Sequence, residues 1–195
     1  MTRRTITTAL VAILAGCFGE FGGSGGPGGG NEDDDNPALA EAAQQGDLRL
    51  TSPAFDDGER IPDEYGRGER DVNPPLELSK VPDEADSLAL IVDDPDAVEP
   101  AGRIWVHWLV WNVPPETTTI PEEWDAAGAV EGENDFGGVG YGGPSPPDAE
   151  HTYRFKAYAL DAVFDLETGA SAEELGREMD GHVIAQTQLT GTYPP

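Results

Sequence analysis

From about residue 47 onward, short apolar runs alternate with clusters rich in glycine and proline. This spacing is typical of a mostly β domain. It predicts its clearest strands over Ser87–Asp93, Ile104–Val113 and Thr152–Leu160. Ser87–Asp93 is apolar almost throughout, so we expect a strand that is covered on both faces.

Two other segments carry helical signals. Ser171 followed by Glu174 forms the pattern of a capping box, which predicts a helix from there to about Met179. Val183–Tyr193 fits both periodicities, and we expect helix first and then strand. Ala38–Gln45 is expected to form one or two turns of helix.

The first residues have the polarity of an export signal. Arg3-Arg4 precedes the apolar run Ala9–Ala15, and Leu14-Ala15-Gly16-Cys17 follows. The run is too short to span a bilayer, which needs about 20 residues. Residues 1–16 are therefore predicted to be a signal peptide, and the resemblance to a lipobox predicts cleavage before Cys17 and lipidation of its thiol. Thr2–Ile6 also resembles a twin-arginine signal, although ordinary secretion and a non-lipidated cysteine remain open alternatives.

A glycine-rich stretch, Gly22–Gly30, and an acidic patch, Glu32–Asp35, come next. Chain of this composition cannot bury a core and behaves as a flexible coil. We therefore expect residues 17–46 to tether a domain, residues 47–195, to a lipid anchor on the extracellular face of the cell membrane.

Composition narrows the possible partners. The 195 residues carry a formal net charge of −27, and lysine occurs only at Lys80 and Lys156. Such a surface repels the phosphates of nucleic acids, which excludes them as electrostatic partners. The acidic excess is typical of halophilic proteins, since at 1 M salt the Debye length is only about 3 Å and self-repulsion is screened. The one cysteine excludes an intramolecular disulfide.

Residues that suit chemistry gather in three segments: Asp93–Asp96, Trp105–Trp108 and Gly140–Tyr153. Side chains alternate between the two faces of a strand. One face of the second segment's strand is thus predicted to carry Trp105, His107, Leu109 and Trp111, and the other Val106, Trp108 and Val110. His151 and Tyr153 share a face in the same way. If these strands are neighbours, two histidines, a tryptophan and a tyrosine line one cavity.

The loop Gly142-Gly143-Pro144 would be stiff and would leave backbone N–H groups open to a ligand. Imidazole and backbone donors together suit a small anion such as phosphate. Asp94 is expected to hold a histidine in the donor tautomer and to raise its pKa. Taken singly, each feature also has an ordinary structural explanation, as a satisfied strand histidine, a turn or a loop, and His182 is interpreted as structural.

The order of these motifs resembles the phosphatidylethanolamine-binding protein family in its bacterial and archaeal form, also called Raf-kinase-inhibitor-like proteins. The resemblance runs from about Leu48 to Tyr193 and rests on Thr51-Ser52-Pro53-Ala54-Phe55, Ile61-Pro62, Asn73-Pro74-Pro75-Leu76, Asp94-Pro95-Asp96-Ala97, Trp105-Val106-His107-Trp108, Asn112-Val113-Pro114, Gly140–Pro147, His151-Thr152-Tyr153, Gly181-His182-Val183 and Gly191-Thr192-Tyr193. It implies a mainly β fold, in which a large antiparallel sheet packs on a smaller one with a few peripheral helices.

The resemblance also implies a pocket built from Asp94, Trp105, His107, Gly143, Pro144, His151 and Tyr153. With Asp96 and Gly142 from the three segments, these are the predicted ligand-binding residues. Three departures bear on the pocket and its surroundings: Val98 stands where the family usually has proline, Leu78 where tryptophan is common, and Gly66–Val72 is divergent.

The sequence therefore predicts a non-catalytic binding protein for a small anionic or phospho-containing ligand, with no cofactor and no metal. It shows no activated nucleophile, because Cys17 lies at the anchor and Ser145 lies between prolines. One alternative is an inhibitor or regulator of an unknown partner protein. A less favoured one is a metal-assisted hydrolase with His107, His151, Asp94 and Asp96 as ligands.

Overall fold

The computed structural model describes residues 36–195. The predicted signal peptide, the predicted lipidation site Cys17 and most of the predicted tether lie outside the described residues. Across residues 36–195, no helix combines the length and the apolar character needed to cross a membrane.

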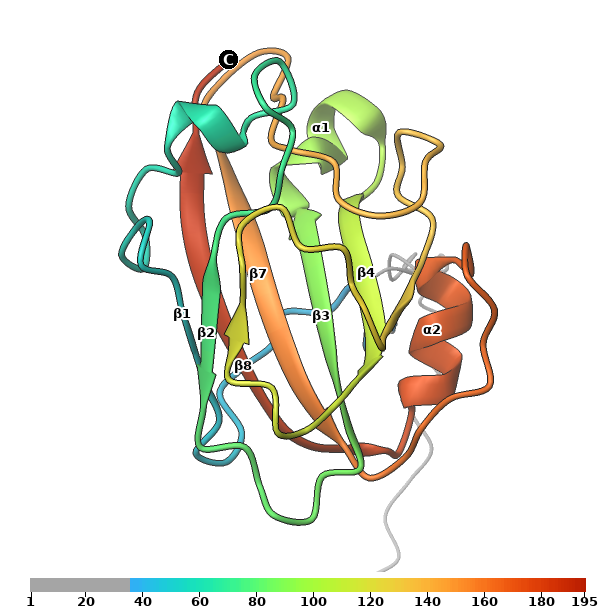
Figure 1. The fold of residues 1–195 in the computed structure, drawn as a ribbon. Coiled ribbons are helices and arrows are strands. Elements are labelled where there is room, and N and C mark those ends of the chain that lie inside the picture. Colours follow the sequence, from blue (N-terminus) through green and yellow to red (C-terminus); the bar gives the residue numbers. More distant parts are fainter. Residues whose placement is uncertain (1–35) are drawn as a thin grey trace, which may run out of the picture.

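Two antiparallel sheets form the domain (Figure 1). The five-stranded sheet has the order β6-β4-β3-β7-β8, and the three-stranded sheet has the order β1-β2-β5. The large sheet consists of β3 (Ser87–Asp94), β4 (Trp105–Val113), β6 (Val130–Glu131), β7 (His151–Leu160) and β8 (Val183–Tyr193). The small sheet consists of β1 (Arg49–Thr51), β2 (Leu76–Ser79) and β5 (Thr119–Ile120). The predicted arrangement of a large sheet packed on a smaller one is confirmed.

The main core lies between the two sheets. Leu50 of β1, Leu78 of β2 and Ile120 of β5 pack there against Leu90 of β3 and Phe155 of β7. β3 is buried at all eight of its positions, as its continuous apolar run predicts. Asp94, the last residue of β3, therefore lies buried at one edge of this core.

Helices are few and peripheral. A 3-10 turn (Pro95–Ala97) leads directly into the short helix α1 (Val98–Ala101) after β3, and another 3-10 turn covers Asp63–Tyr65. Helix α2 (Ala172–Met179) begins at the predicted capping box, in which Ser171 Oγ accepts from the backbone N–H of Glu174 and the Glu174 carboxylate accepts from that of Ser171. α2 packs on the outer face of the large sheet, beside β4 (Figure 1).

The expected helix at the start of Val183–Tyr193 is wrong, because the whole segment is strand β8. Its residues pair with β7 from Val183 opposite Leu160 to Tyr193 opposite His151. Burial along β8 alternates with a period of two, as in a strand. The segment forms a strand because the ten residues of β7 provide backbone hydrogen-bond partners along its length.

Ala38–Gln45 does not form the expected helix either. We call residues 36–45 the strap, because they cross the outer face of the large sheet as a turn followed by extended chain. Their carbonyl groups accept hydrogen bonds from the sheet: Lys156 Nζ donates to Ala38 O at 2.6 Å, and Arg154 Nη2 donates to Leu39 O at 2.8 Å. Carbonyls bonded in this way are not available to a helix. Residues 36–45, which precede the predicted boundary at 47, are thus bonded to the large sheet.

Candidate ligand-binding site

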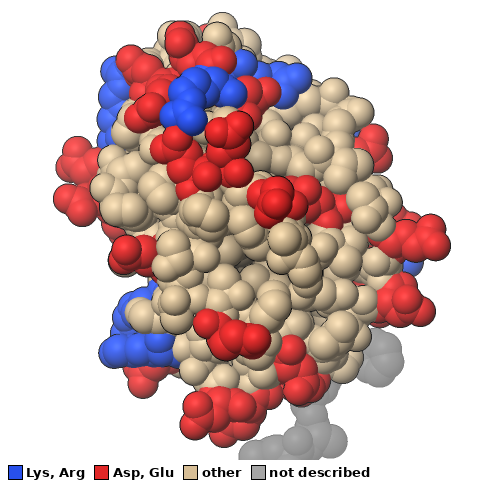
Figure 2. Space-filling view, viewed as in Figure 1, with Lys and Arg blue, Asp and Glu red and all other residues tan. Residues whose placement is uncertain are grey.

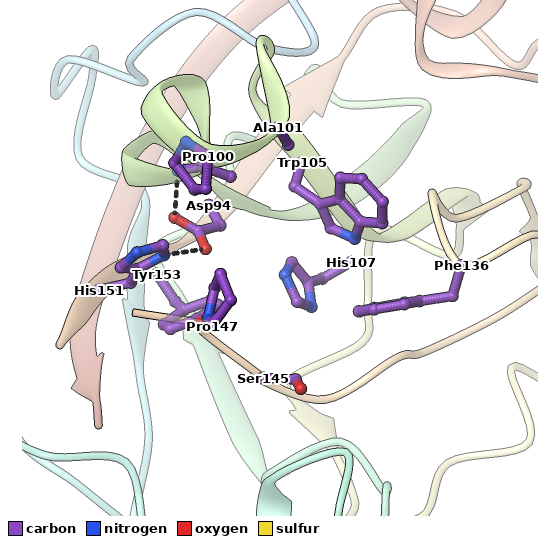
Figure 3. Close-up of a pocket in the computed structure, with 11 residues that line it drawn as sticks. Asp94, Pro100, Ala101, Trp105, His107, Phe136, Ser145, Pro147, His151 and Tyr153 are labelled. Atoms are coloured by element: carbon purple, nitrogen blue, oxygen red, sulfur yellow. Dashed lines mark hydrogen bonds and ion pairs between the residues drawn. The ribbon is translucent and has the colours of Figure 1, made fainter. Parts of the chain in front are cut away.

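A cavity of about 190 Å³ opens at the end of β3 (Figure 3). Its walls come from the last residue of β3, from α1 and the turn before it, from the start of β4 and β7, and from two loops. They are Asp94, Ala97, Pro100, Ala101, Trp105, His107, Phe136, Ser145, Pro147, His151 and Tyr153. In Figure 3, Trp105, His107 and Phe136 lie on one side of the cavity, and Asp94 and His151 lie on the other. Five of the predicted site residues therefore meet in one cavity.

The strands that carry the two histidines are not neighbours, because β3 lies between β4 and β7. The face assignment for β4 also needs correction. Val92 pairs with Trp108 and Asp93 with Val106, so His107 is the extra residue of a β-bulge. Beyond the bulge Trp108 packs in the core between the sheets, whereas Leu109 and Trp111 pack on the outer face. A bulge re-aims one side chain, and here it directs His107 into the cavity.

Asp94 forms the corner at which β3 ends. Its Oδ1 accepts from the backbone N–H groups of Asp96 at 2.9 Å and Ala97 at 3.1 Å, which caps the 3-10 turn. Its Oδ2 accepts from Nδ1 of His151 at 2.7 Å. The carboxylate thus holds the turn and the imidazole in one arrangement.

His151 lies between two carboxylates. Nδ1 faces Asp94, and Nε2 is 3.0 Å from Oδ1 of Asp148. Burial lowers the pKa of His151, but the hydrogen bonds and charges of Asp94 and Asp148 outweigh burial, and the pKa is raised. The expected effect of Asp94 on a histidine matches this geometry.

His107 is in the opposite electrostatic state. Burial lowers the pKa of His107, and its hydrogen bond to the Gly142 carbonyl opposes this only in part. Because a carbonyl can only accept, Nδ1 must donate to Gly142 O, which is 2.6 Å away. In the neutral imidazole Nε2 is then a hydrogen-bond acceptor.

Two buried donors on the cavity wall, Nε1 of Trp105 and the hydroxyl of Tyr153, make no hydrogen bond of good geometry with the described residues, although the hydroxyl lies near the Asp94 carboxylate and the backbone of Ser145. Burial raises the pKa of Tyr153, so the phenol stays protonated. Buried polar groups are rarely left without a partner unless a water or ligand supplies one. These two atoms are therefore available to a bound molecule, whereas the other two unpartnered donors of the described chain, Nε1 of Trp111 and the hydroxyl of Tyr141, lie outside the cavity lining.

The chain's family follows from comparison with known proteins. A family model described as phosphatidylethanolamine-binding protein matches residues 51–194. This chain belongs to the phosphatidylethanolamine-binding protein family. The UPF0098 protein of Methanothermobacter thermautotrophicus is 45% identical over 151 residues, which cover 75% of this chain and 98% of that relative. The UPF0098 protein of Chlamydia trachomatis is 47% identical over 149 residues, again covering 75% and 98%.

Solved structures of the family have the same fold. A putative phosphatidylethanolamine-binding protein homolog from Chlamydia trachomatis matches with a TM-score of 0.70 and 46% sequence identity, covering 75% of this chain and 96% of that one. E. coli YbcL, described as a new member of the mammalian family, matches with a TM-score of 0.71 and 32% identity, covering 76% of this chain and 98% of that one.

The glycine loop, Gly142-Gly143-Pro144, was predicted to offer free backbone N–H groups to a ligand. This prediction is wrong for Gly142 and Gly143, because both N–H groups have partners within the protein. The N–H of Gly142 donates to the carbonyl of His107 at 2.9 Å, and that of Gly143 donates to Oδ1 of Asp71 at 2.7 Å. A Cβ on Gly143 would collide with the backbone of residues 65–67. Gly142, Gly143 and Pro144 therefore frame the cavity without lining it, because the loop is packed against the chain segment that precedes Asn73.

Asp96 does not line the cavity either. Its Oδ2 accepts from the backbone N–H of Thr152 at 2.7 Å, and its side chain faces an adjacent surface hollow that Glu99, Asp148 and Glu150 also line. His182 pairs with Asp161 at 2.8 Å and lies outside the cavity lining, which agrees with its structural interpretation.

The three departures from the family pattern have separate explanations. Val98 begins α1 and is 38% exposed, while Pro100 of the same helix lines the cavity. Leu78 is buried in the core between the sheets. The divergent segment Gly66–Val72 contains the two residues that support the glycine loop: Asp71 accepts from Gly143, and the backbone N–H of Arg67 donates to Pro144 O at 3.0 Å.

Sequence reasoning missed Phe136, which contributes a whole aromatic wall (Figure 3). The available signal was an aromatic residue in the loop Asn134–Gly138, shortly before the glycine loop. The ligand set of the less favoured hydrolase alternative, His107, His151, Asp94 and Asp96, is not found as a metal site among the described residues. Within residues 36–195 no group of three or more His, Cys, Asp or Glu side chains is placed to hold a metal ion.

Proposed function

We propose that this domain is a binding protein whose cavity takes a small molecule by a phosphate-like anionic group and does not transform it. The observation that carries the proposal is the pair of buried, unpartnered donors, Nε1 of Trp105 and the hydroxyl of Tyr153, on the wall that also holds His107. Hydrogen bonds from such donors to a charged group are stronger than those between neutral groups. An oxyanion placed between them would satisfy both.

His107 supplies the third contact. In the neutral imidazole, Nε2 is a hydrogen-bond acceptor, so it can accept a hydrogen bond from the P–OH group of a monoanionic phosphate ester. A dianionic ester would instead favour protonation at Nε2, because a nearby negative charge raises the pKa of an imidazole. In both cases one proton lies between His107 and the ligand.

The charge of the protein limits affinity. Acidic side chains are spread over the surface in Figure 2, and no lysine or arginine is among the described residues that line the cavity. The imidazole of His151 already faces two carboxylates. We therefore propose short-range recognition by neutral donors, in a halophilic protein whose long-range field is screened by concentrated salt.

The bonding of the cavity residues supports a non-catalytic role. Both ring nitrogens of His151 face carboxylates, and Nδ1 of His107 is fixed on a backbone carbonyl. Ser145 has no hydrogen bond to a histidine or carboxylate within residues 36–195, so no base activates it there.

The test is calorimetric titration of methyl phosphate into the protein in concentrated potassium chloride. We expect saturable binding that is weakened about tenfold or more by Tyr153→Phe and by Trp105→Phe, since each change removes one donor and keeps an aromatic side chain. The control is Val163→Ala, at a position that is 65% exposed and outside the cavity lining. Equal affinities in all four proteins would contradict the proposal.

We further propose that the domain works on the extracellular face of the cell membrane, held by lipid on Cys17. The motif Leu14-Ala15-Gly16-Cys17 after an apolar run supports this. In an archaeal host the full chain should be recovered with membranes, and Cys17→Ser should move it to the soluble or secreted fraction. A membrane fraction that is the same for both chains would contradict anchoring through Cys17.

A further inference from the structure

Phe136 is the largest side chain of the cavity wall that does not come from a strand of the large sheet. Its ring meets the rings of Trp105 and His107 edge-on, with centroid distances of 5.4 and 5.3 Å. Figure 3 shows it closing the cavity on the side away from Asp94 and His151. The size of the group that fits beside the recognised anion therefore depends on where this ring stands.

The ring is held in place by a built turn. Oδ1 of Asn134 accepts from the backbone N–H groups of Phe136 at 3.0 Å and Gly138 at 3.2 Å, and Nδ2 of Asn134 donates to Gly140 O at 2.8 Å. Asn134 is itself 5% exposed. All three hydrogen bonds fix the backbone from which Phe136 projects.

Two further contacts hold the ring itself. The guanidinium of Arg67 lies over the ring, 3.8 Å from its centroid. Gly142 lies so close that a Cβ there would be 2.7 Å from Cδ2 of Phe136. Arg67 is not among the lining residues, so the ring also separates its charge from the cavity. Cation–π contact and close packing together make Phe136 a rigid wall.

We propose that Phe136 is the specificity-determining residue of the cavity, and that Arg67 is the positioning residue that holds it. Resting on the proposed function, this makes the Phe136 ring the wall against which the substituent of a phosphate-like ligand packs. The larger the substituent, the closer it comes to this ring. Removing the ring would replace an aromatic wall by open, apolar space.

The experiment compares methyl phosphate with phenyl phosphate in wild type, Phe136→Leu and Phe136→Ala. The readout is the ratio of the two affinities, because a charge newly exposed at Arg67 would strengthen both ligands alike. Changes of one or more methylene-sized groups in a pocket alter selectivity by about tenfold or more, so we expect the ratio to shift toward phenyl phosphate by at least that factor in Phe136→Ala. Phe136→Leu should shift the ratio of affinities in the same direction. This variant provides the test if Phe136→Ala does not fold.

Arg67→Met tests the positioning role, since it removes the charge over the ring and keeps an unbranched chain. We expect a smaller shift of the same ratio, with the thermal midpoint recorded in parallel. A fall in the midpoint with an unchanged ratio would mean that Arg67 only stabilises the loop. An unchanged ratio in both Phe136 variants would overturn the proposal for Phe136.

A second measurement separates this proposal from the proposed function. Apolar cavities can take up benzene without any polar contact. We expect benzene to bind Phe136→Ala more tightly than wild type, as followed by the NMR signals of Trp105 in a titration. If methyl phosphate fails to bind wild type while benzene still discriminates, the anion proposal fails and the size limit holds. If benzene binds both proteins alike, Phe136 does not limit the cavity.

Discussion

Nδ1 of His151 donates to Oδ2 of Asp94 across 2.7 Å and so ties the first residue of β7 to the last residue of β3. Both side chains are about 5% exposed, so the pair is shielded from solvent. The same carboxylate caps the turn before α1. Asp94 thus holds both the imidazole of His151 and the backbone of the turn at the cavity rim.

Asp94→Asn should lower the pKa of His151, because burial, which lowers it, is then opposed by Asp148 alone. The raised pKa of the folded protein gives a stabilising contribution that is complete below the ordinary value of 6.5 and is lost as pH rises through the folded pKa. The stability difference between the two proteins should therefore be largest on the acid side. An NMR titration of the chain's three histidines measures the pKa directly.

Asp148→Asn is the matched control for this prediction. Its side chain is 56% exposed, and solvent screens such a partner. We expect a smaller fall in the pKa of His151 than in Asp94→Asn. A larger fall would mean that the exposed carboxylate, and not the buried one, sets the charge of the imidazole.

The convergence of Asp94, Trp105, His107, His151 and Tyr153 could be predicted because their motifs resemble those of the phosphatidylethanolamine-binding protein family. Strand parity did not predict it, since β3 lies between the strands of the two histidines. The bulge at His107 could not be predicted, because it arises from pairing with β3. It reverses the faces of residues 108–111, and a second register shift before Val113 restores the alternation. Parity alone therefore predicts, wrongly, that His107 shares a face with Leu109.

The glycine loop and the strap were mispredicted for a related reason. Open N–H groups were inferred from Gly142 and Gly143, but partners 35 and 72 positions away take those donors. The sequence of the strap predicts weak helix, whereas its conformation depends on residues more than a hundred positions later, among them Lys156 and Arg154. Long-range hydrogen bonds leave no periodic signal in either segment.

Asp93 holds the two side chains, Arg154 and Lys156, that donate hydrogen bonds to the strap. It is fully buried and accepts from Nε of Arg154 at 2.6 Å and from Nζ of Lys156 at 2.7 Å. Asp93→Ala leaves two buried cations without their anion, which should lower the free energy of unfolding by about 3–5 kcal/mol. Lys156→Met, which replaces a buried lysine with an apolar chain, should cost clearly less. Denaturant titration in concentrated salt compares the two, and equal losses would argue against an uncompensated charge as the cause.

The strap should behave as part of the domain. It buries Ala38, Leu39 and Ala42 against the outer core, and burial of a leucine side chain alone contributes about 1.5–3 kcal/mol. A chain beginning at residue 47 should therefore have a lower thermal midpoint than one beginning at residue 36. The latter should match the full chain. Equal midpoints for the two truncated chains would place the folded boundary after the strap.

The effect of Gly176→Ala in α2 on stability should change sign when the strap is removed. Glycine to alanine inside a helix normally gains about 1 kcal/mol. Here a Cβ on Gly176 would overlap the side-chain amide of Asn36, the first residue of the strap. Gly176→Ala should therefore destabilise the chain that begins at residue 36 and stabilise the chain that begins at residue 47. The same sign in both backgrounds would show that Asn36 does not restrict α2.

The lowered pKa of His107 predicts how anion binding depends on pH. A bound anion near Nε2 raises the pKa of this imidazole, so binding takes up a proton over the interval between the free and the bound pKa. Affinity should be constant below the pKa of the free protein and should fall as pH rises through the bound-state pKa. Methyl sulfate is the suitable probe, because its own charge does not change over this interval. His107→Gln should bind it with no such dependence, and a wild-type affinity that is flat across the same interval would show that His107 does not touch the anion.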